Sequence, residues 1–174
     1  MRRNKVRLTA RIADWLGVRD NRLTAAALVL TAAMIVFAGV MIGGGTVKNV
    51  DFARIAERVG NSVTTLEPSD ENALSKLLGL DASAYEGWLF YNGESVMDVS
   101  ELLIVKSADE AALNEAEDAV NARLASQITA FESYGTNQSF LLKNALTEKS
   151  SLYLFYAVGE HAAEWLDAFR ACVR

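Results

Sequence analysis

Apolar residues recur at helical spacing among polar ones in two early segments, residues 50–60 and 66–80. The first segment opens at Asp51 and the second at Ser69 or Asp70, and all three are residue types that cap helix N-termini. The expected inward positions of these two short helices are Phe52, Ile55, Val59, Leu74, Leu77 and Leu78.

Four later segments have the short, branched or aromatic composition of β-strands. EGWLFYNG at residues 86–93 and ELLIVKS at 101–107 are followed further along by a hairpin of residues 146–149 and 152–158. LLIV and LYLFYAV are apolar at successive positions, so neither face of these strands suits water. We therefore expect central strands that are covered on both sides, or on one side by a partner.

A long helix is expected between the two pairs of strands. Ser107 and Glu110 form a capping box, and apolar residues at helical spacing continue to about residue 134. A short helical piece at residues 137–145 and a final helix at 160–173 show related patterns. This order predicts an α+β domain with an antiparallel sheet of about four strands in ββα-ββα order. The sheet would pack with the long helix and the C-terminal helix.

Residues 23–42 carry no charge, which predicts a different environment for them. Twenty helical residues, at 1.5 Å each, span roughly the 30 Å apolar core of a bilayer. We therefore predict a transmembrane helix at 23–42, a linker at 43–50 and a folded domain at 51–174. The alternative is a secretory signal that is cleaved near the glycines ending this stretch.

The charge of the chain divides at the same stretch. Residues 1–23 hold seven basic and two acidic side chains, whereas the remainder holds ten basic and twenty acidic ones. Basic flanks of membrane spans stay in the cytoplasm, so residues 1–22 are expected there and the C-terminal domain is expected outside the cell. The membrane is thus an expected partner. Nucleic acid is not, because no nucleic-acid-binding fold accompanies the basic segment.

Few residues offer catalytic chemistry. His161 and Cys172 are the single histidine and the single cysteine, and about 16 Å of the same predicted helix separates them. They therefore form no nucleophile–base pair and supply too few ligands for a zinc site. The sequence also lacks phosphate-loop, dinucleotide and calcium-loop patterns. It therefore predicts no cofactor, no metal and no enzyme activity.

Glu101 is the strongest candidate for a functional carboxylate. Strand alternation places it on the same face as Leu103, where it would need a partner such as Lys106, Lys149 or a backbone donor. As a functional group it would contact a ligand or act as an acid or base, and with Asp98 it would resemble the carboxylate pair of a hydrolase. As a structural group it would hold a strand end or cap a helix.

Aromatic residues provide the other candidates for ligand contacts. Most strand aromatics are expected to fill the core, but exposed ones such as Trp88 and Tyr91 would stack on sugars or hold a peptide. Tyr134 lies in the turn after the long helix. It would either pack against that helix or present its hydroxyl group to a ligand.

The order of these segments resembles an extracytoplasmic domain of unknown function, numbered 4358, of Gram-positive bacteria of the Firmicutes type. The resemblance rests on GWLFYNG, SELLIVKSAD, FESYGTNQSF and LYLFYAVG, and it covers about 120 residues from Asp51 onward. It implies an N-terminal signal, lipid anchor or membrane helix, and it implies no activity.

These features together predict a single-pass, membrane-anchored binding or scaffold domain of the bacterial cell envelope, with an envelope protein or a glycan as partner. One alternative is an envelope hydrolase that uses Glu101 with Asp98. Another is a secreted domain released by signal cleavage. The ligand, the pathway and the oligomeric state stay open.

Overall fold

A computed structural model describes residues 47–132 and 135–174. The predicted segments 1–22 and 23–42, the first four residues of the predicted linker and Tyr134 lie outside the described residues. Within the described part, none of the helices has the length and apolar character needed to cross a membrane.

The described residues form one sheet and the helices around it. The elements are α2 (Phe52–Gly60), β1 (Glu67–Pro68), α3 (Glu71–Leu78), a 3-10 helix η1 (Ala82–Ala84), β2 (Gly87–Asn92), β3 (Glu101–Lys106), α4 (Glu110–Phe131), α5 (Thr136–Lys143), β4 (Leu146–Lys149), β5 (Tyr153–Val158) and α6 (Ala162–Val173).

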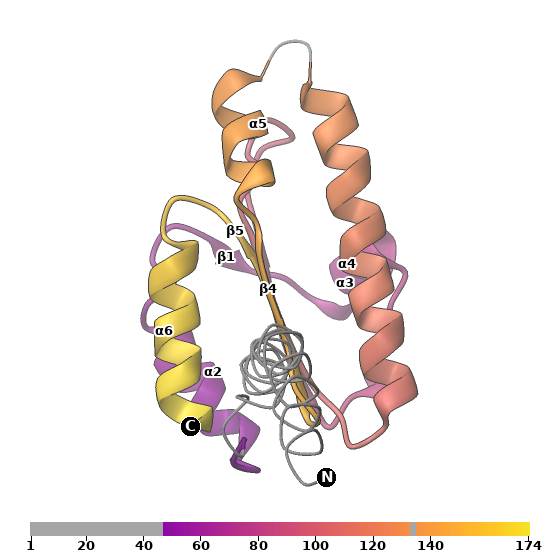
Figure 1. Cartoon of the computed structure of the whole chain (residues 1–174), viewed down its shortest axis with the longest axis vertical. Coiled ribbons are helices and arrows are strands. Elements are labelled where there is room, and N and C mark those ends of the chain that lie inside the picture. The colour runs from indigo at the N-terminus through magenta and orange to yellow at the C-terminus, as the bar shows by residue number, and fades with distance from the viewer. Residues whose placement is uncertain (1–46, 133–134) are drawn as a thin grey trace, which may run out of the picture. The chain divides into compact units, whose positions relative to one another are not determined.

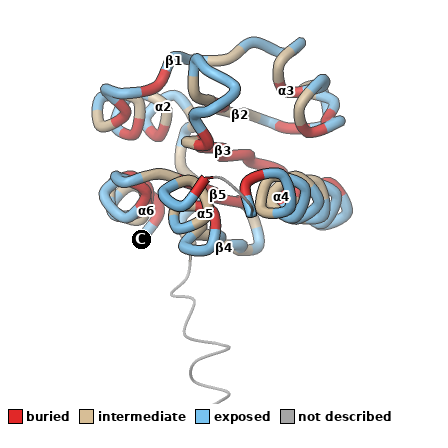
Figure 2. The backbone as a smooth tube through the Cα atoms, turned by 90° about the horizontal axis from the view of Figure 1, so that it is seen from above, coloured by how far each residue is buried: buried red, intermediate tan, exposed pale blue. Residues whose placement is uncertain are grey.

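The sheet is antiparallel throughout, with the strand order β1-β2-β3-β5-β4. Figures 1 and 2 show three layers, with α2 and α6 on one face of the sheet and α3 and α4 on the other. The central strands β3 and β5 are buried along their whole length. This confirms the α+β class and the prediction that these two strands are covered on both faces.

Strand alternation divides the core into two parts. Leu103 and Val105 pack toward α3 and α4, whereas Leu102 and Ile104 pack toward α2 and α6. Each helix contributes the apolar face that its spacing predicted, including Ile55 of α2. On α4 the apolar residues at helical spacing all join the first of these clusters: Leu113, Ala116, Val120, Leu124, Ile128 and Phe131.

The structure corrects the predicted number of strands from about four to five. The additional strand, β1, contains only Glu67 and Pro68, and it pairs with Tyr91 and Asn92 at the edge of the sheet. Proline lacks an N–H donor, so it is tolerated at an edge but reads as a turn signal in the sequence.

The predicted start of the long helix is also corrected. The N-cap of α4 is Asp109, whose carboxylate accepts a hydrogen bond of 2.9 Å from the Ala111 N–H. Ser107 does not cap the helix, because its backbone N–H still donates to the Leu152 carbonyl and continues the sheet. Its hydroxyl group accepts instead from the Asp109 N–H.

The chain joins the domain at one end of the central strands. Lys106, the last residue of β3, pairs with Tyr153, and the Tyr153 hydroxyl group accepts a hydrogen bond of 2.9 Å from the Val50 N–H. The Lys106 ammonium group donates to the Val50 carbonyl, and the Lys48 N–H donates to the Val173 carbonyl. These contacts fix residues 48–50 at the Lys106 end of the sheet.

Candidate functional site

A pocket lies at the opposite end of the sheet, where Glu101 of β3 pairs with Val158 of β5. The β2–β3 loop, the start of α5 and the connection from β5 into α6 form most of its lining, and Thr65, before β1, completes it. Its volume is about 420 Å³. Five steps of a strand, about 17 Å, separate this end of β3 from the end where the chain joins the domain. We call this feature the loop-end pocket.

The loop-end pocket combines polar and apolar side chains, a mixture that binding sites use to orient and hold a ligand. Its polar side chains include Ser95, Asp98, Asn137, Gln138, Glu160 and His161. Its apolar side chains are Met97, Val99, Leu141 and Trp165. Asp98 and Glu160 give the wall of the pocket two negative charges.

The β2–β3 loop owes its shape to short-range hydrogen bonds. Asp98 accepts a bond of 2.9 Å from the Ser100 N–H, and the Gly93 N–H donates to the Ser100 carbonyl. Gly93 is required here, because a Cβ atom at this position would collide with the Asp98 carboxyl group. The Asp98 side chain therefore lies directly against the backbone of Gly93.

The other two walls are linked to this loop and to the core. Gln138 of α5 donates from its side-chain amide to the Met97 carbonyl, at 3.2 Å. On the α6 side, His161 Nδ1 lies 3.3 Å from Glu164 Oε1, and the His161 ring centroid lies 6.5 Å from that of Trp165. Trp165 itself is buried, so the pocket floor is part of the hydrophobic core.

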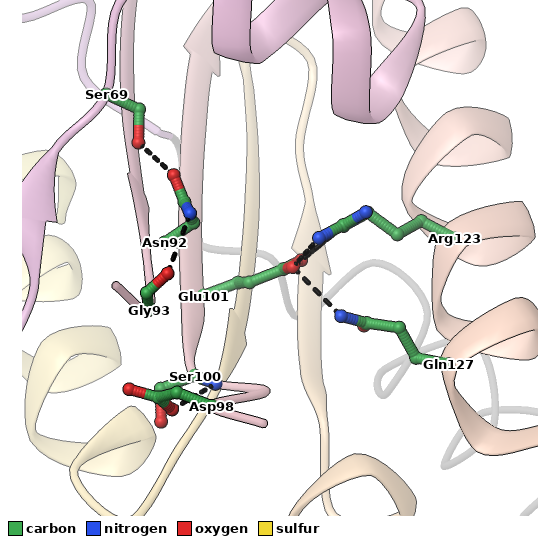
Figure 3. A network of polar contacts seen from close by, with 8 residues as sticks. All are labelled: Ser69, Asn92, Gly93, Asp98, Ser100, Glu101, Arg123 and Gln127. Atoms are coloured by element: carbon green, nitrogen blue, oxygen red, sulfur yellow. Dashed lines mark hydrogen bonds and ion pairs between the residues drawn. The ribbon is translucent and has the colours of Figure 1, made fainter. Parts of the chain in front are cut away.

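Glu101 lies next to the pocket-lining Ser100, but its carboxylate points into the α4 side of the sheet (Figure 3). Arg123 Nε lies 2.7 and 2.9 Å from the two carboxylate oxygens, and the Gln127 amide donates to one of them at 3.0 Å. Arg123 Nη2 completes the ion pair. Glu101 is only 1% exposed, so it needs these partners.

These contacts correct the expected partners of Glu101. Lys106 pairs with Glu86, and Lys149 pairs with Glu117. Arg123 and Gln127 were not predicted as partners of Glu101 from the sequence. A signal for them was present, since they lie four residues apart on α4, beside its inward apolar positions, where polar side chains reach the Glu101 end of β3.

Two polar atoms of this cluster have no hydrogen-bond partner within the described residues: Gln127 Oε1 and the Tyr156 hydroxyl oxygen. Tyr156 is fully buried in β5. Burial raises the pKa of its phenol, the negative charge of Glu101 raises it further, and Arg123 opposes the shift. The hydroxyl group is thus held in its neutral form.

The other predicted site residues do not converge. Trp88 is half-buried on the α3/α4 face of β2, whereas Tyr91 is buried on the α2/α6 face. Asp98 is exposed, and in Figure 3 its carboxylate lies apart from Glu101, which faces Arg123. Among the predicted ligand or carboxylate candidates that the structure describes, only Asp98 lines the loop-end pocket. Ligand contacts by Glu101, Trp88, Tyr91 and Tyr134 stay predictions.

Metal-binding chemistry has no support in the part of the chain that the structure describes. No group of three or more His, Cys, Asp or Glu side chains there is arranged to hold a metal ion.

Comparison with known proteins gives one match. Residues 60–159 match the model of a family described as "Domain of unknown function (DUF4358)". The matched region includes β2, β3, α4, α5 and β5, and with them most of the loop-end pocket. No curated protein and no solved structure matches the chain.

Proposed function

The chain belongs to the DUF4358 family of domains of unknown function, and we propose that it is a single-pass, membrane-anchored binding or scaffold module of the bacterial cell envelope. The proposed anchor is the uncharged stretch 23–42, with residues 1–22 in the cytoplasm and the folded domain outside. The envelope of a Gram-positive bacterium is the setting that the family resemblance implies.

One observation carries the binding role: the loop-end pocket and the attachment of the chain lie at opposite ends of the same strands. A domain tethered through residues 47–50 presents the Glu101 end of its sheet away from the tether. The pocket is thereby open to a partner in the envelope, such as a peptide segment or a glycan. Its size and mixed lining suit a partner of this kind.

The hydrolase alternative receives less support from the geometry. A hydrolytic carboxylate pair requires two carboxylates that face a common substrate position. Glu101 is bound by Arg123 and Gln127 on the α4 side, and Asp98 is turned over Gly93 in the loop. In the secreted alternative, signal cleavage makes the mature chain start near residue 44, and the pocket is unchanged.

A crosslinking experiment in intact cells tests the binding role. A photoreactive amino acid at Asn137, on the pocket rim, should give a defined adduct with an envelope protein or glycan. The same amino acid at Lys76, an exposed residue of α3, should not. Ser95→Trp would fill the pocket and should abolish the adduct. The matched control Ser75→Trp, on α3, should leave it unchanged.

The proposal fails in either of two cases. Equal labelling from Asn137 and Lys76 would show that the loop-end pocket has no selective partner. An Asn137 adduct that persists in the Ser95→Trp variant would show that the partner does not occupy the pocket.

A further inference from the structure

Five basic side chains among the described residues take part in no ion pair: Lys48, Arg54, Arg58, Lys76 and Lys143. All five are exposed. The first three lie in the segment where the chain joins the domain or on the adjacent helix α2. The basic residues that do pair with glutamates are Lys106, Arg123, Lys149, Arg170 and Arg174.

Two of these unpaired side chains line a hollow between α2 and α6. Arg54 and Arg58 are four residues apart and therefore lie on one side of α2, one turn from each other. With Asn61 and Cys172 they border a hollow of about 350 Å³, whose one acidic side chain is Glu57. We call it the α2/α6 hollow; Figure 1 shows the two helices side by side.

The side chains of the α2/α6 hollow suit a phosphate group. A guanidinium group presents N–H donors in a fixed fork that matches the oxygens of phosphate, and here two such groups border one concave surface. Glu57 offsets one of the two positive charges, and the hollow keeps a net positive charge. The arrangement therefore favours an anionic phosphate ligand over a neutral one.

We propose that the α2/α6 hollow binds the phosphate headgroup of an anionic phospholipid in the membrane that anchors the chain. This inference rests on the proposed anchor at residues 23–42. Val47 follows Ile42 by five residues, so the chain itself keeps the two within about 18 Å. The first described residues therefore stay near the membrane surface, and they are fixed beside α6 by the bond from Lys48 N–H to the Val173 carbonyl.

Charge favours the lipid surface over free phosphate as the source of the ligand. From residue 24 onward the chain has twice as many acidic as basic side chains, so an anionic membrane repels most of the domain. The α2/α6 hollow is an exception, because its two arginines outnumber its one acidic side chain. Docking through the α2/α6 hollow would then hold the loop-end pocket away from the bilayer, because that pocket lies at the other end of the sheet.

The test uses the full-length chain in lipid nanodiscs. A fluorescent non-natural amino acid is placed at Ala53, an exposed position of α2, so that Cys172 of the hollow keeps its side chain. Its quenching by nitroxide groups on lipid headgroups is compared in phosphatidylcholine discs and in discs that also contain phosphatidylglycerol. Three basic residues near an anionic surface should raise the quenching about twofold, and about 1 M salt should remove the increase.

Matched variants assign the effect to the hollow. Arg54→Gln with Arg58→Gln should abolish the increase, whereas Lys76→Gln with Lys143→Gln, the same charge change at exposed positions of α3 and α5, should retain it. An equal response of both double variants would overturn the proposal. A chain that inserts into the discs but shows no lipid dependence refutes the docking alone. A chain that does not insert refutes the anchor.

Discussion

Tyr153 and Tyr156 stand three residues apart in β5, and both are fully buried. The Tyr153 hydroxyl group accepts from the Val50 N–H at 2.9 Å and lies 3.3 Å from the Lys48 and Val50 carbonyl oxygens. The Tyr156 hydroxyl group has no partner among the described residues. Tyr153 therefore attaches the start of the domain to the sheet. Within that part of the chain, Tyr156 is buried without a hydrogen bond that would offset the cost of removing its hydroxyl group from water.

Replacement of each tyrosine by phenylalanine should have opposite effects. Tyr153→Phe removes a buried hydrogen bond and should lower the free energy of unfolding by about 1–2 kcal/mol. Tyr156→Phe removes an unpaired buried hydroxyl group and should leave the free energy unchanged or raise it by up to about 1 kcal/mol. Urea unfolding of the full-length protein, followed by tryptophan fluorescence, measures both. A loss on Tyr156→Phe as large as that on Tyr153→Phe would contradict this interpretation.

The Glu101–Arg123 ion pair is the second residue-scale determinant of stability. Arg123→Ala leaves a buried carboxylate without its bidentate partner and should cost about 3 kcal/mol in the same unfolding assay. The double variant Glu101→Leu with Arg123→Leu should cost less, because no charge is then left buried. Arg58→Ala, an exposed and unpaired arginine, is the control and should change stability by less than about 0.5 kcal/mol. Equal losses for Arg123→Ala and Arg58→Ala would show that Glu101 does not depend on the pair.

At the scale of elements, helices were easier to predict than the edge of the sheet. Apolar residues that recur every three or four positions lie on one side of a helix, and that side is the buried one. The inward faces of α2, α4 and α6 can therefore be predicted from the sequence. β1 has two residues, one of them proline, which is too short for alternation to show. Its pairing depends on the neighbouring β2, and local sequence carries no information about such a distant partner.

The contact between α2 and β2 provides a prediction at this scale. A Cβ atom at Gly87 would collide with the ring of Phe52, so Gly87→Ala should destabilise the domain by about 1–3 kcal/mol. In a Phe52→Ala background Gly87→Ala should cost less, since that change removes the two ring carbons that the new methyl group meets most closely. Unfolding measurements on the single and double variants decide this. A neutral Gly87→Ala variant would show that α2 packs less closely on the sheet.

For the whole molecule, the sequence predicted the α+β class, the burial of β3 and β5 on both faces, and the face on which Glu101 lies. It did not predict the loop-end pocket. That pocket combines residues near positions 65, 95–100, 137–141 and 160–165. Those residues meet only because β2, β3 and β5 are antiparallel and α5 folds back against α4. Arg123 was missed for the same reason, since its partner lies 22 residues earlier in the chain.

The orientation of the chain across the membrane is the central claim, and thiol labelling in intact cells tests it most directly. In a Cys172→Ala background, a single cysteine is placed either at Asn137, on the rim of the loop-end pocket, or at Asn4, in the basic N-terminal segment. A membrane-impermeant maleimide should label Asn137→Cys in intact cells, and it should label Asn4→Cys only after the cells are permeabilised. Protection of Asn137→Cys until permeabilisation would place the domain inside the cell and contradict the account.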